Sequence, residues 1–271
     1  MGQHVLDASQ FSEFSEFGSP TLTRAPGMMQ NPGTMTDVAK RIIVALDTSS
    51  EEQALEWVRT LGSGCGAFKV GMQLYAAAGP QIIGKIRDLG GEVFLDLKLH
   101  DIPSTVAKAT EALVRLEPLM LNYHALGGAQ MLRGAADAAQ GLCAKSGLRR
   151  PLLLAVTILT SHDQRSLREI NLHAPVAQQV ASLAHLAKTA GMNGVVASAQ
   201  EVSLVKQACG LGFVVVTPGI RPASATPDDQ SRTMAPADAV ASGVDYMVIG
   251  RPITHAPDPL RALEAIVNSV A

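Results

Sequence analysis

Short apolar runs alternate with amphipathic stretches along most of this chain, and that alternation restricts its possible folds more than any other feature. The runs are rich in Val, Ile and Leu and are nearly continuous, which is typical of strands buried on both faces of a parallel sheet. Apolar residues at helical spacing separate them, for example behind Pro103 and again from Val176. The runs lie at residues 41–46, 67–70, 92–97, 119–124, 152–159, 194–197, 213–217 and 246–249.

These units predict a closed barrel. Roughly eight strand-and-helix units in about 230 residues fit a (β/α)8 barrel. A doubly wound open sheet is the alternative, but no G-x-G-x-x-G follows the first strand and the chain contains no Walker A motif. The sequence therefore predicts an α/β protein with a single TIM-barrel domain over residues 39–271.

Residues 1–38 differ from the rest of the chain. They contain a repeated Ser-Glu-Phe, scattered Gly and Pro, and no sustained period of either a helix or a strand. We expect a disordered extension here. An artefact of expression or of start-site assignment is favoured over a docking motif built on Phe11, Phe14 and Phe17.

Charge and cysteine content exclude several classes of protein. The 271 residues hold 22 basic and 24 acidic side chains, so the net charge of -2 lacks the positive excess of proteins that bind nucleic acid or anionic membranes. No apolar stretch approaches the roughly 18 residues that a membrane span needs. Cys65, Cys143 and Cys209 are odd in number and widely spaced, which favours free thiols in a reducing cytosol. We expect a soluble, cytoplasmic protein without nucleic-acid or membrane partners.

One predicted strand ends in a cluster of charges. The run at 92–97 leads into Asp96-Leu97-Lys98-Leu99-His100-Asp101-Ile102. In a strand, Asp96 and Lys98 point to the same face, and Asp101 follows in the turn. Each buried ion costs several kcal/mol to desolvate unless it is paired, so a core strand has no structural need for them. A structural ion pair is one interpretation, and a catalytic array is the one we favour.

The other predicted strand ends carry residues that can bind a substrate or take part in catalysis. Active sites of such barrels lie at the carboxyl ends of the strands. Arg221 and Arg251 follow the seventh and eighth strands, where these barrels bind phosphate through backbone N–H groups and guanidinium forks. A phosphate monoester is therefore the expected substrate class. The remaining strand-end candidates are Asp47, Lys69, His124 and Thr160.

Together these residues resemble a known enzyme family. From about Arg41 to the C-terminus the chain resembles the bacterial form of orotidine 5'-phosphate decarboxylase. The resemblance rests on Asp96-x-Lys98-x-x-Asp101-Ile102-Pro103-x-Thr105, Val44-Ala45-Leu46-Asp47, Lys69-Val70-Gly71, Thr217-Pro218-Gly219-Ile220-Arg221 and Ile249-Gly250-Arg251. The Asp-x-Lys-x-x-Asp core is shared with 3-keto-gulonate phosphate decarboxylase and hexulose phosphate synthase, and the phosphate loop with Gln230 discriminates among them.

The resemblance implies decarboxylation of orotidine 5'-monophosphate (OMP) to uridine 5'-monophosphate (UMP), the last step of UMP biosynthesis, with neither metal nor organic cofactor. It implies that Lys98 stabilises a C6 carbanion and protonates it, that Asp96 lies against the departing carboxylate, and that Lys69 pairs within the same catalytic array. It also implies a homodimer in which Asp101 enters the neighbouring subunit's site. The other implied substrate contacts are Asp47 and Lys69 with the ribose, Thr105 with the ribose across the dimer, Thr160 with the pyrimidine, and Arg221, Gln230, Arg251 and the Gly250 N–H with the phosphate.

Two other functions stay open on the sequence. One is a metal-dependent phosphosugar decarboxylase or epimerase on the same barrel. The other is a catalytically inactive barrel that only senses nucleotides, although such a protein has no use for an intact Asp96, Lys98 and Asp101. His100 and His124 are possible metal ligands, but a metal site needs several converging His and carboxylate ligands, so we expect structural roles for both.

Overall fold

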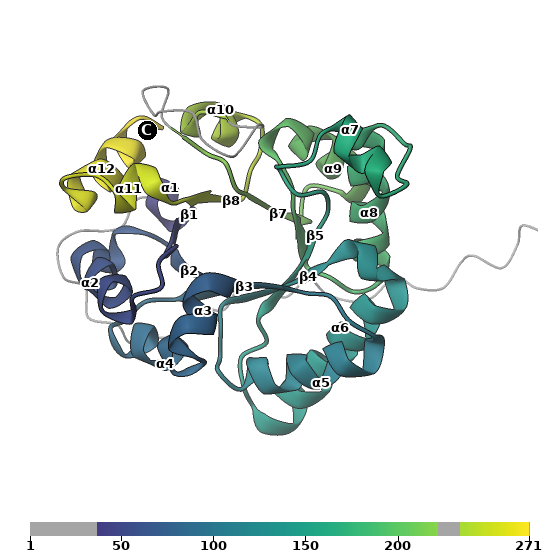
Figure 1. Ribbon diagram of the computed structural model, residues 1–271, viewed down its shortest axis with the longest axis horizontal. Coiled ribbons are helices and arrows are strands. Elements are labelled where there is room, and N and C mark those ends of the chain that lie inside the picture. The colour runs from purple at the N-terminus through teal and green to yellow at the C-terminus, as the bar shows by residue number, and fades with distance from the viewer. Residues whose placement is uncertain (1–36, 222–233, 271) are drawn as a thin grey trace, which may run out of the picture. The chain divides into compact units, whose positions relative to one another are not determined.

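Eight parallel strands close into a barrel in chain order, with helices around the outside (Figure 1). The structure is a computed structural model, and it describes residues 37–221 and 234–270. The predicted (β/α)8 fold is confirmed. The strands are β1 (Ile42–Ala45), β2 (Ala67–Gly71), β3 (Val93–Leu99), β4 (Met120–His124), β5 (Leu152–Val156), β6 (Gly194–Val196), β7 (Val214–Thr217) and β8 (Tyr246–Ile249).

Helices connect the strands and cover the barrel. The single-turn η elements are η1 (Gly62–Gly64), η2 (Ala125–Gly127) and η3 (Ala199–Glu201). The α-helices are α1 (Asp37–Lys40), α2 (Glu51–Leu61), α3 (Met72–Ala78), α4 (Gln81–Asp88), α5 (Pro103–Val114), α6 (Gly128–Ser146), α7 (Gln164–Glu169), α8 (Val176–Thr189), α9 (Val202–Cys209), α10 (Pro236–Ala241), α11 (Arg251–Thr254) and α12 (Pro259–Asn268). None of the helices in the described ranges is long and apolar enough to cross a membrane.

Some element bounds differ from the predicted ones. β5 ends at Val156, three residues before Leu159, because its neighbour β6 ends at Val196 and offers no strand beyond that point. At the N-terminus, Asp37 and Val38 begin α1 although the sequence assigned them to the extension. Asp37 pairs with Lys40 at 3.1 Å and places a negative charge at the helix start, where it is favourable. Residues 1–36, including the Phe motif, lie outside the described residues.

The inside of the barrel changes from apolar to charged toward the carboxyl ends of the strands. One apolar cluster lines the interior, made of Ile43, Ala45, Ala67, Phe94, Met120, Leu154, Val216 and Val248. Side chains alternate along a strand, so a residue two positions beyond a cluster member shares its inward face. Lys69, Asp96 and Asn122 each follow a cluster member in this way, and together they form a polar layer above the apolar one.

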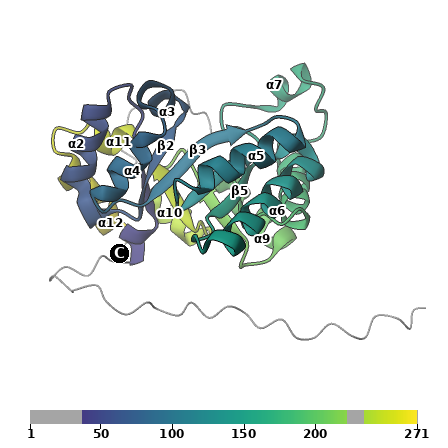
Figure 2. The same cartoon turned by 90° about the horizontal axis from the view of Figure 1, so that it is seen from below.

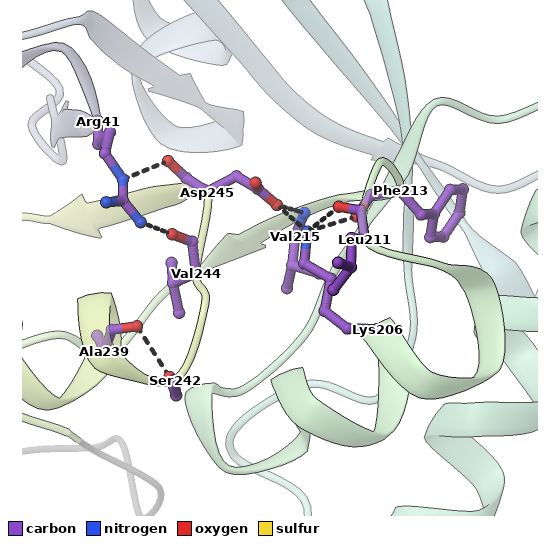
Figure 3. A network of polar contacts seen from close by, with 9 residues as sticks. All are labelled: Arg41, Lys206, Leu211, Phe213, Val215, Ala239, Ser242, Val244 and Asp245. Atoms are coloured by element: carbon purple, nitrogen blue, oxygen red, sulfur yellow. Dashed lines mark hydrogen bonds and ion pairs between the residues drawn. The ribbon is translucent and has the colours of Figure 1, made fainter. Parts of the chain in front are cut away.

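A network of polar contacts joins the strands at the opposite, amino-terminal end (Figure 3). Lys206 Nζ donates to Asp245 Oδ2 at 2.7 Å and to the carbonyl oxygens of Leu211 and Phe213. Asp245 Oδ2 also accepts the backbone N–H of Val215, while Arg41 Nε donates to the carbonyl oxygen of Asp245. Because Arg41 precedes β1 and Asp245 precedes β8, the network ties together the first and last strands where the barrel closes. It contributes to stability far from the carboxyl-end site.

The two ends of the barrel can be told apart in the side view (Figure 2). α3 and α7 lie at one end, and α1 lies at the other. α3 follows β2 and α7 follows β5, so the first end is the carboxyl end of the strands. The three cysteines are all free thiols, as the sequence predicts.

The apolar layer predicts a large effect of truncating Leu154. The Leu154 side chain is fully buried in the interior cluster, so Leu154→Ala should lower the free energy of unfolding by about 2–5 kcal/mol. Leu211→Ala is the control, since Leu211 is 84% exposed and its loss should change stability by less than about 0.5 kcal/mol. Urea unfolding followed by circular dichroism measures both. Equal losses for the two variants would contradict this packing.

Candidate active site

The Asp96 carboxylate is the centre of a chain of opposite charges at the carboxyl end of the barrel. Its Oδ1 lies 2.7 Å from Lys98 Nζ, and its Oδ2 lies 3.5 Å from Lys69 Nζ. Lys69 Nζ also lies 2.8 Å from Asp47 Oδ1. The side chains of Lys69 and Asp96 are only 11% and 10% exposed. Four residues that the sequence predicted at three strand ends are thus brought together.

Mutual attraction keeps the buried members of this chain charged. Burial alone would raise the pKa of Asp96, but Lys69 and Lys98 outweigh it, and the net effect is a pKa below 3.8. Burial would likewise lower the pKa of Lys69, but Asp96 and Asp47 bring it above 10.5. Both groups are therefore ionised at neutral pH. The array presents fixed charges to any ligand at the mouth of the barrel.

Gly71 makes room for the Lys69–Asp47 pair. A Cβ on Gly71 would lie 3.0 Å from Lys69 Nζ and 3.7 Å from Asp47 Oδ1. Lys69 and Gly71 share one face of β2, so the lysine side chain extends over the bare glycine toward Asp47. A side chain at position 71 would displace the ammonium group. Gly71 belongs to the Lys69-Val70-Gly71 motif, but the sequence alone predicts no role for it.

Asn122 on β4 is a site residue that the sequence analysis missed. Its amide nitrogen donates to Asp96 Oδ1 at 2.6 Å, and its amide oxygen accepts the backbone N–H of Lys98 at 2.8 Å. The residue is fully buried. A signal was present, because Asn122 lies two residues after Met120 in an otherwise apolar predicted strand and therefore faces inward beside Asp96.

A cavity of about 320 Å³ opens beside the charged array. Its floor is formed by part of the apolar layer, including Ala45, Phe94 and Val248. Its polar lining contains Asp47, Lys69, Asp96, Lys98, Thr160, Arg221, Gly250 and Arg251. The charges of the array therefore meet an apolar surface that excludes water, and electrostatic interactions are stronger there than in bulk solvent.

The expected phosphate residues line this cavity as far as the structure describes them. Arg221 follows β7, and Gly250 and Arg251 follow β8 at the start of α11. Gly250 also packs against the array, since a Cβ there would lie 3.7 Å from Asp47 Oδ2. The predicted phosphate contact Gln230 lies outside the described residues.

Asp101 and Thr105 are not brought into the cavity of their own chain. Both are exposed, and neither is among the described residues that line it. Asp101 Oδ1 instead accepts the N–H of the next residue, Ile102, at 2.6 Å. The structure therefore brings together most of the predicted site within this chain, without these two residues.

The two histidines near the site stack on each other. The ring centroids of His100 and His124 are 5.4 Å apart. Burial, together with nearby His100, Lys98 and His162, lowers the pKa of His124, whose Nδ1 accepts the N–H of Leu126 at 3.4 Å. No group of three or more His, Cys, Asp or Glu side chains in the described ranges is arranged to hold a metal ion.

The chain is similar to known proteins over most of its length. Residues 40–266 match the model of the "Orotidine 5'-phosphate decarboxylase / HUMPS family". The chain belongs to this family. It is 50% identical over 237 residues to the orotidine 5'-phosphate decarboxylase of Syntrophotalea carbinolica, covering 88% of this chain and 97% of that one. It is 48% identical over 237 residues to the enzyme of the same name from Geotalea daltonii, covering 88% of this chain and 98% of that one.

Two solved structures share this fold. The crystal structure of orotidine 5'-phosphate decarboxylase from Lactobacillus acidophilus superposes with a TM-score of 0.75 at 42% identity, covering 84% of this chain and 98% of that chain. An uncharacterized conserved protein from Geobacillus kaustophilus superposes with a TM-score of 0.74 at 39% identity, covering 85% of this chain and all of that one. The predicted family is confirmed.

The charge chain predicts how stability depends on alkaline pH. Asp96→Asn leaves only Asp47 to offset the burial of Lys69, so the folded-state pKa of Lys69 should fall. In the wild type, the raised Lys69 pKa contributes stability that is complete below pH 10.5 and is lost as pH rises through the folded-state value. The free energy of unfolding of Asp96→Asn should be about 3–5 kcal/mol lower than that of the wild type near pH 8. The difference in Tm between the two proteins should shrink toward about pH 11.

Scanning calorimetry across this pH range tests the expectation. Glu117→Gln is the control, because it removes a carboxylate from a half-exposed pair with Arg87, and a guanidinium does not titrate in this range. Its Tm difference should be small and independent of pH. A constant difference between the wild type and Asp96→Asn from about pH 8 to about pH 11 would contradict the coupling of Asp96 to Lys69.

Proposed function

We propose that this chain decarboxylates OMP to UMP and CO2 and so catalyses the last step of UMP biosynthesis. The observation that carries the proposal is the position of the Lys98–Asp96–Lys69 array beside a cavity that Arg221 and Arg251 also line. The two arginines can bind the anionic phosphate of a nucleotide, and the Lys98 ammonium can contact its base. The names of the relatives support the same substrate.

The chemistry requires stabilisation of negative charge on carbon. Loss of CO2 from C6 of OMP leaves an electron pair on C6 that the ring carbonyls cannot delocalise well. In our proposal the Lys98 ammonium lies next to C6, stabilises the pair as it forms, and then donates its proton to C6 to give UMP. The carboxylate leaves next to Asp96. No metal or organic cofactor is needed to accept the electron pair, because the fixed charges already stabilise it.

The remaining residues bind and orient the substrate. We assign the ribose hydroxyls to Asp47 and Lys69, and the pyrimidine edge to Thr160. We assign phosphate binding to Arg221, Arg251, the Gly250 N–H and Gln230. Binding energy from the phosphate, which lies far from C6, then holds the reacting geometry.

A homodimer completes the site in this proposal, with Asp101 and Thr105 entering the neighbouring subunit's cavity. Three exposed apolar side chains support it, because they follow β2, β3 and β4 at the carboxyl end. Met72 is 60% exposed, Ile102 64% and Leu126 37%. Such a group of apolar side chains next to an active site suits burial against a second copy. A cytoplasmic location is also part of the proposal, supported by three free thiols.

An assay of OMP decarboxylation tests the function directly. The absorbance change on conversion of OMP to UMP should persist in excess chelator, whereas a metal-dependent phosphosugar enzyme of the same fold would be inactive on OMP. A protein that binds UMP but leaves OMP unchanged would be a nucleotide sensor and would refute the proposal.

Lys98→Ala should abolish turnover while UMP still binds. Both the stabilising charge and the proton source are lost, so kcat should fall by at least about three powers of ten. Lys85→Ala is the matched control, because Lys85 pairs with Glu51 on the surface and does not line the cavity. Its kcat should stay at the wild-type value. Retention of a tenth of the activity by Lys98→Ala would remove Lys98 from the central role.

Subunit mixing tests the shared site. Asp101→Ala and Lys98→Ala should each be inactive, but a heterodimer of the two contains one site with both residues. Random exchange places half of the subunits in heterodimers, so about a quarter of the wild-type activity per site should return. Continued inactivity after exchange, with heterodimers verified by mass spectrometry, would mean that Asp101 serves its own subunit.

A further inference from the structure

Asn122 bonds to two parts of the charged array at once. Its side-chain amide is buried, so both its donor and its acceptor need partners within the protein. The amide nitrogen donates to Asp96 Oδ1 at 2.6 Å. The amide oxygen accepts the N–H of Lys98 at 2.8 Å. One uncharged side chain on β4 thus binds the carboxylate of one catalytic candidate and the backbone of another on β3.

The Lys98 backbone needs this support because β3 is irregular at that point. Leu95 pairs with Leu121, and Leu99 pairs with Tyr123, so three residues of β3 lie opposite the single residue Asn122. Lys98 has a φ of 51°, in the left-handed region that a lysine rarely adopts. The Asn122 amide oxygen takes the place of a strand carbonyl for the Lys98 N–H. The irregularity is thereby held in one conformation.

We propose that Asn122 is a positioning residue for the reaction, holding the Asp96 carboxylate and the Lys98 backbone in one arrangement. This inference rests on the proposed decarboxylation. Asp96 Oδ1 accepts hydrogen bonds from both Asn122 and the Lys98 ammonium. When Lys98 gives its proton to carbon, its attraction for Asp96 falls. The amide does not titrate, so it keeps the carboxylate in place until Lys98 is protonated again.

Asn122 acts through other residues and does not bind the substrate. It is not among the described residues that line the cavity. Its loss should therefore lower kcat much more than it changes KM for OMP.

Several charged or titratable groups surround Asn122 and Asp96. They are Asp47 after β1, Lys69 on β2, Lys98 on β3, His100 after β3, His124 on β4, and His162 after β5.

Two substitutions test the role, with a matched control. Asn122→Ala removes both hydrogen bonds and should lower kcat by about 100-fold with a change in KM of less than about threefold. Asn193→Ala is the control, because the Asn193 side-chain oxygen accepts the N–H of Leu153 at 2.9 Å at the far end of the barrel. It removes the same kind of side-chain-to-strand bond and should leave kcat per folded molecule unchanged.

Asn122→Asp separates positioning from a merely structural role. The new carboxyl keeps the size of the amide, but it can donate to Asp96 only while it is protonated. Two carboxyl groups that share a proton have one raised pKa, so the activity of the variant should rise relative to the wild type as pH falls from about 8 to about 5. Its Tm should rise relative to the wild type over the same range, because the group is more easily protonated in the folded state.

Each outcome decides the inference. A kcat for Asn122→Ala within about threefold of the wild type, or a pH–rate profile for Asn122→Asp that parallels the wild type, would overturn it. So would an equal loss of kcat in Asn193→Ala. If Asn122→Ala does not fold, the profile of Asn122→Asp decides. If the wild type does not convert OMP, the proposed function fails, and the positioning role in that reaction fails with it. The pH dependence of the Tm of Asn122→Asp still shows whether residue 122 bonds to Asp96.

Discussion

The interaction on which the site depends is the attraction between one buried carboxylate, Asp96, and two ammonium groups, those of Lys69 and Lys98. Removing an ion from water costs several kcal/mol, so neither Asp96 nor Lys69, whose side chains are only 10% and 11% exposed, is stable as an ion without a partner. Asp96 and Lys69 remain charged because each lies between two charges of opposite sign. Other features of the site serve this arrangement. Gly71 clears space for Lys69, and Asn122 fixes both Asp96 and Lys98.

The barrel places these charges by simple alternation along the strands. Side chains two residues apart share the inward face, so Phe94 lies directly below Asp96, and Ala67 lies below Lys69. The apolar layer forms the floor of the cavity and reduces the dielectric screening of the charges above it. Stabilising polar contacts such as Lys206–Asp245 lie at the opposite end of the barrel. The polar contacts that join the strands and the charged array of the site therefore lie at opposite ends of the barrel axis.

Most of the fold and most of the charged array could be predicted from the sequence, because buried parallel strands have a strong compositional signal and the charges lie at the ends of these strands. All eight strands were predicted, and Asp47, Lys69, Asp96 and Lys98 do converge. Simple alternation did not predict the left-handed conformation of Lys98, which arises from the pairing of β3 with β4. Asn122 was missed for the same reason. The apolar pattern of its own strand places Asn122 on the inward face, but its two hydrogen bonds depend on the irregular pairing of β3 with β4.

Assembly is the part that the sequence could predict only through family resemblance. Asp101 and Thr105 follow the same strand as Asp96, yet neither lines the cavity described for their own chain. Asp101 lies at a bend between the end of β3 at Leu99 and the start of α5 at Pro103, Thr105 lies in the first turn of α5, and both are exposed.

Direct titration of the Lys69 side chain tests the central claim that opposite charges outweigh burial in this array. The 13Cε chemical shift of Lys69 can be followed by NMR against pH in the folded protein, with Lys69→Arg used to assign the signal. The account predicts that Lys69 titrates above its ordinary pKa of 10.5. A Lys69 pKa below 10.5 would mean that desolvation dominates, and it would contradict the account of a site built from fixed, mutually stabilised charges.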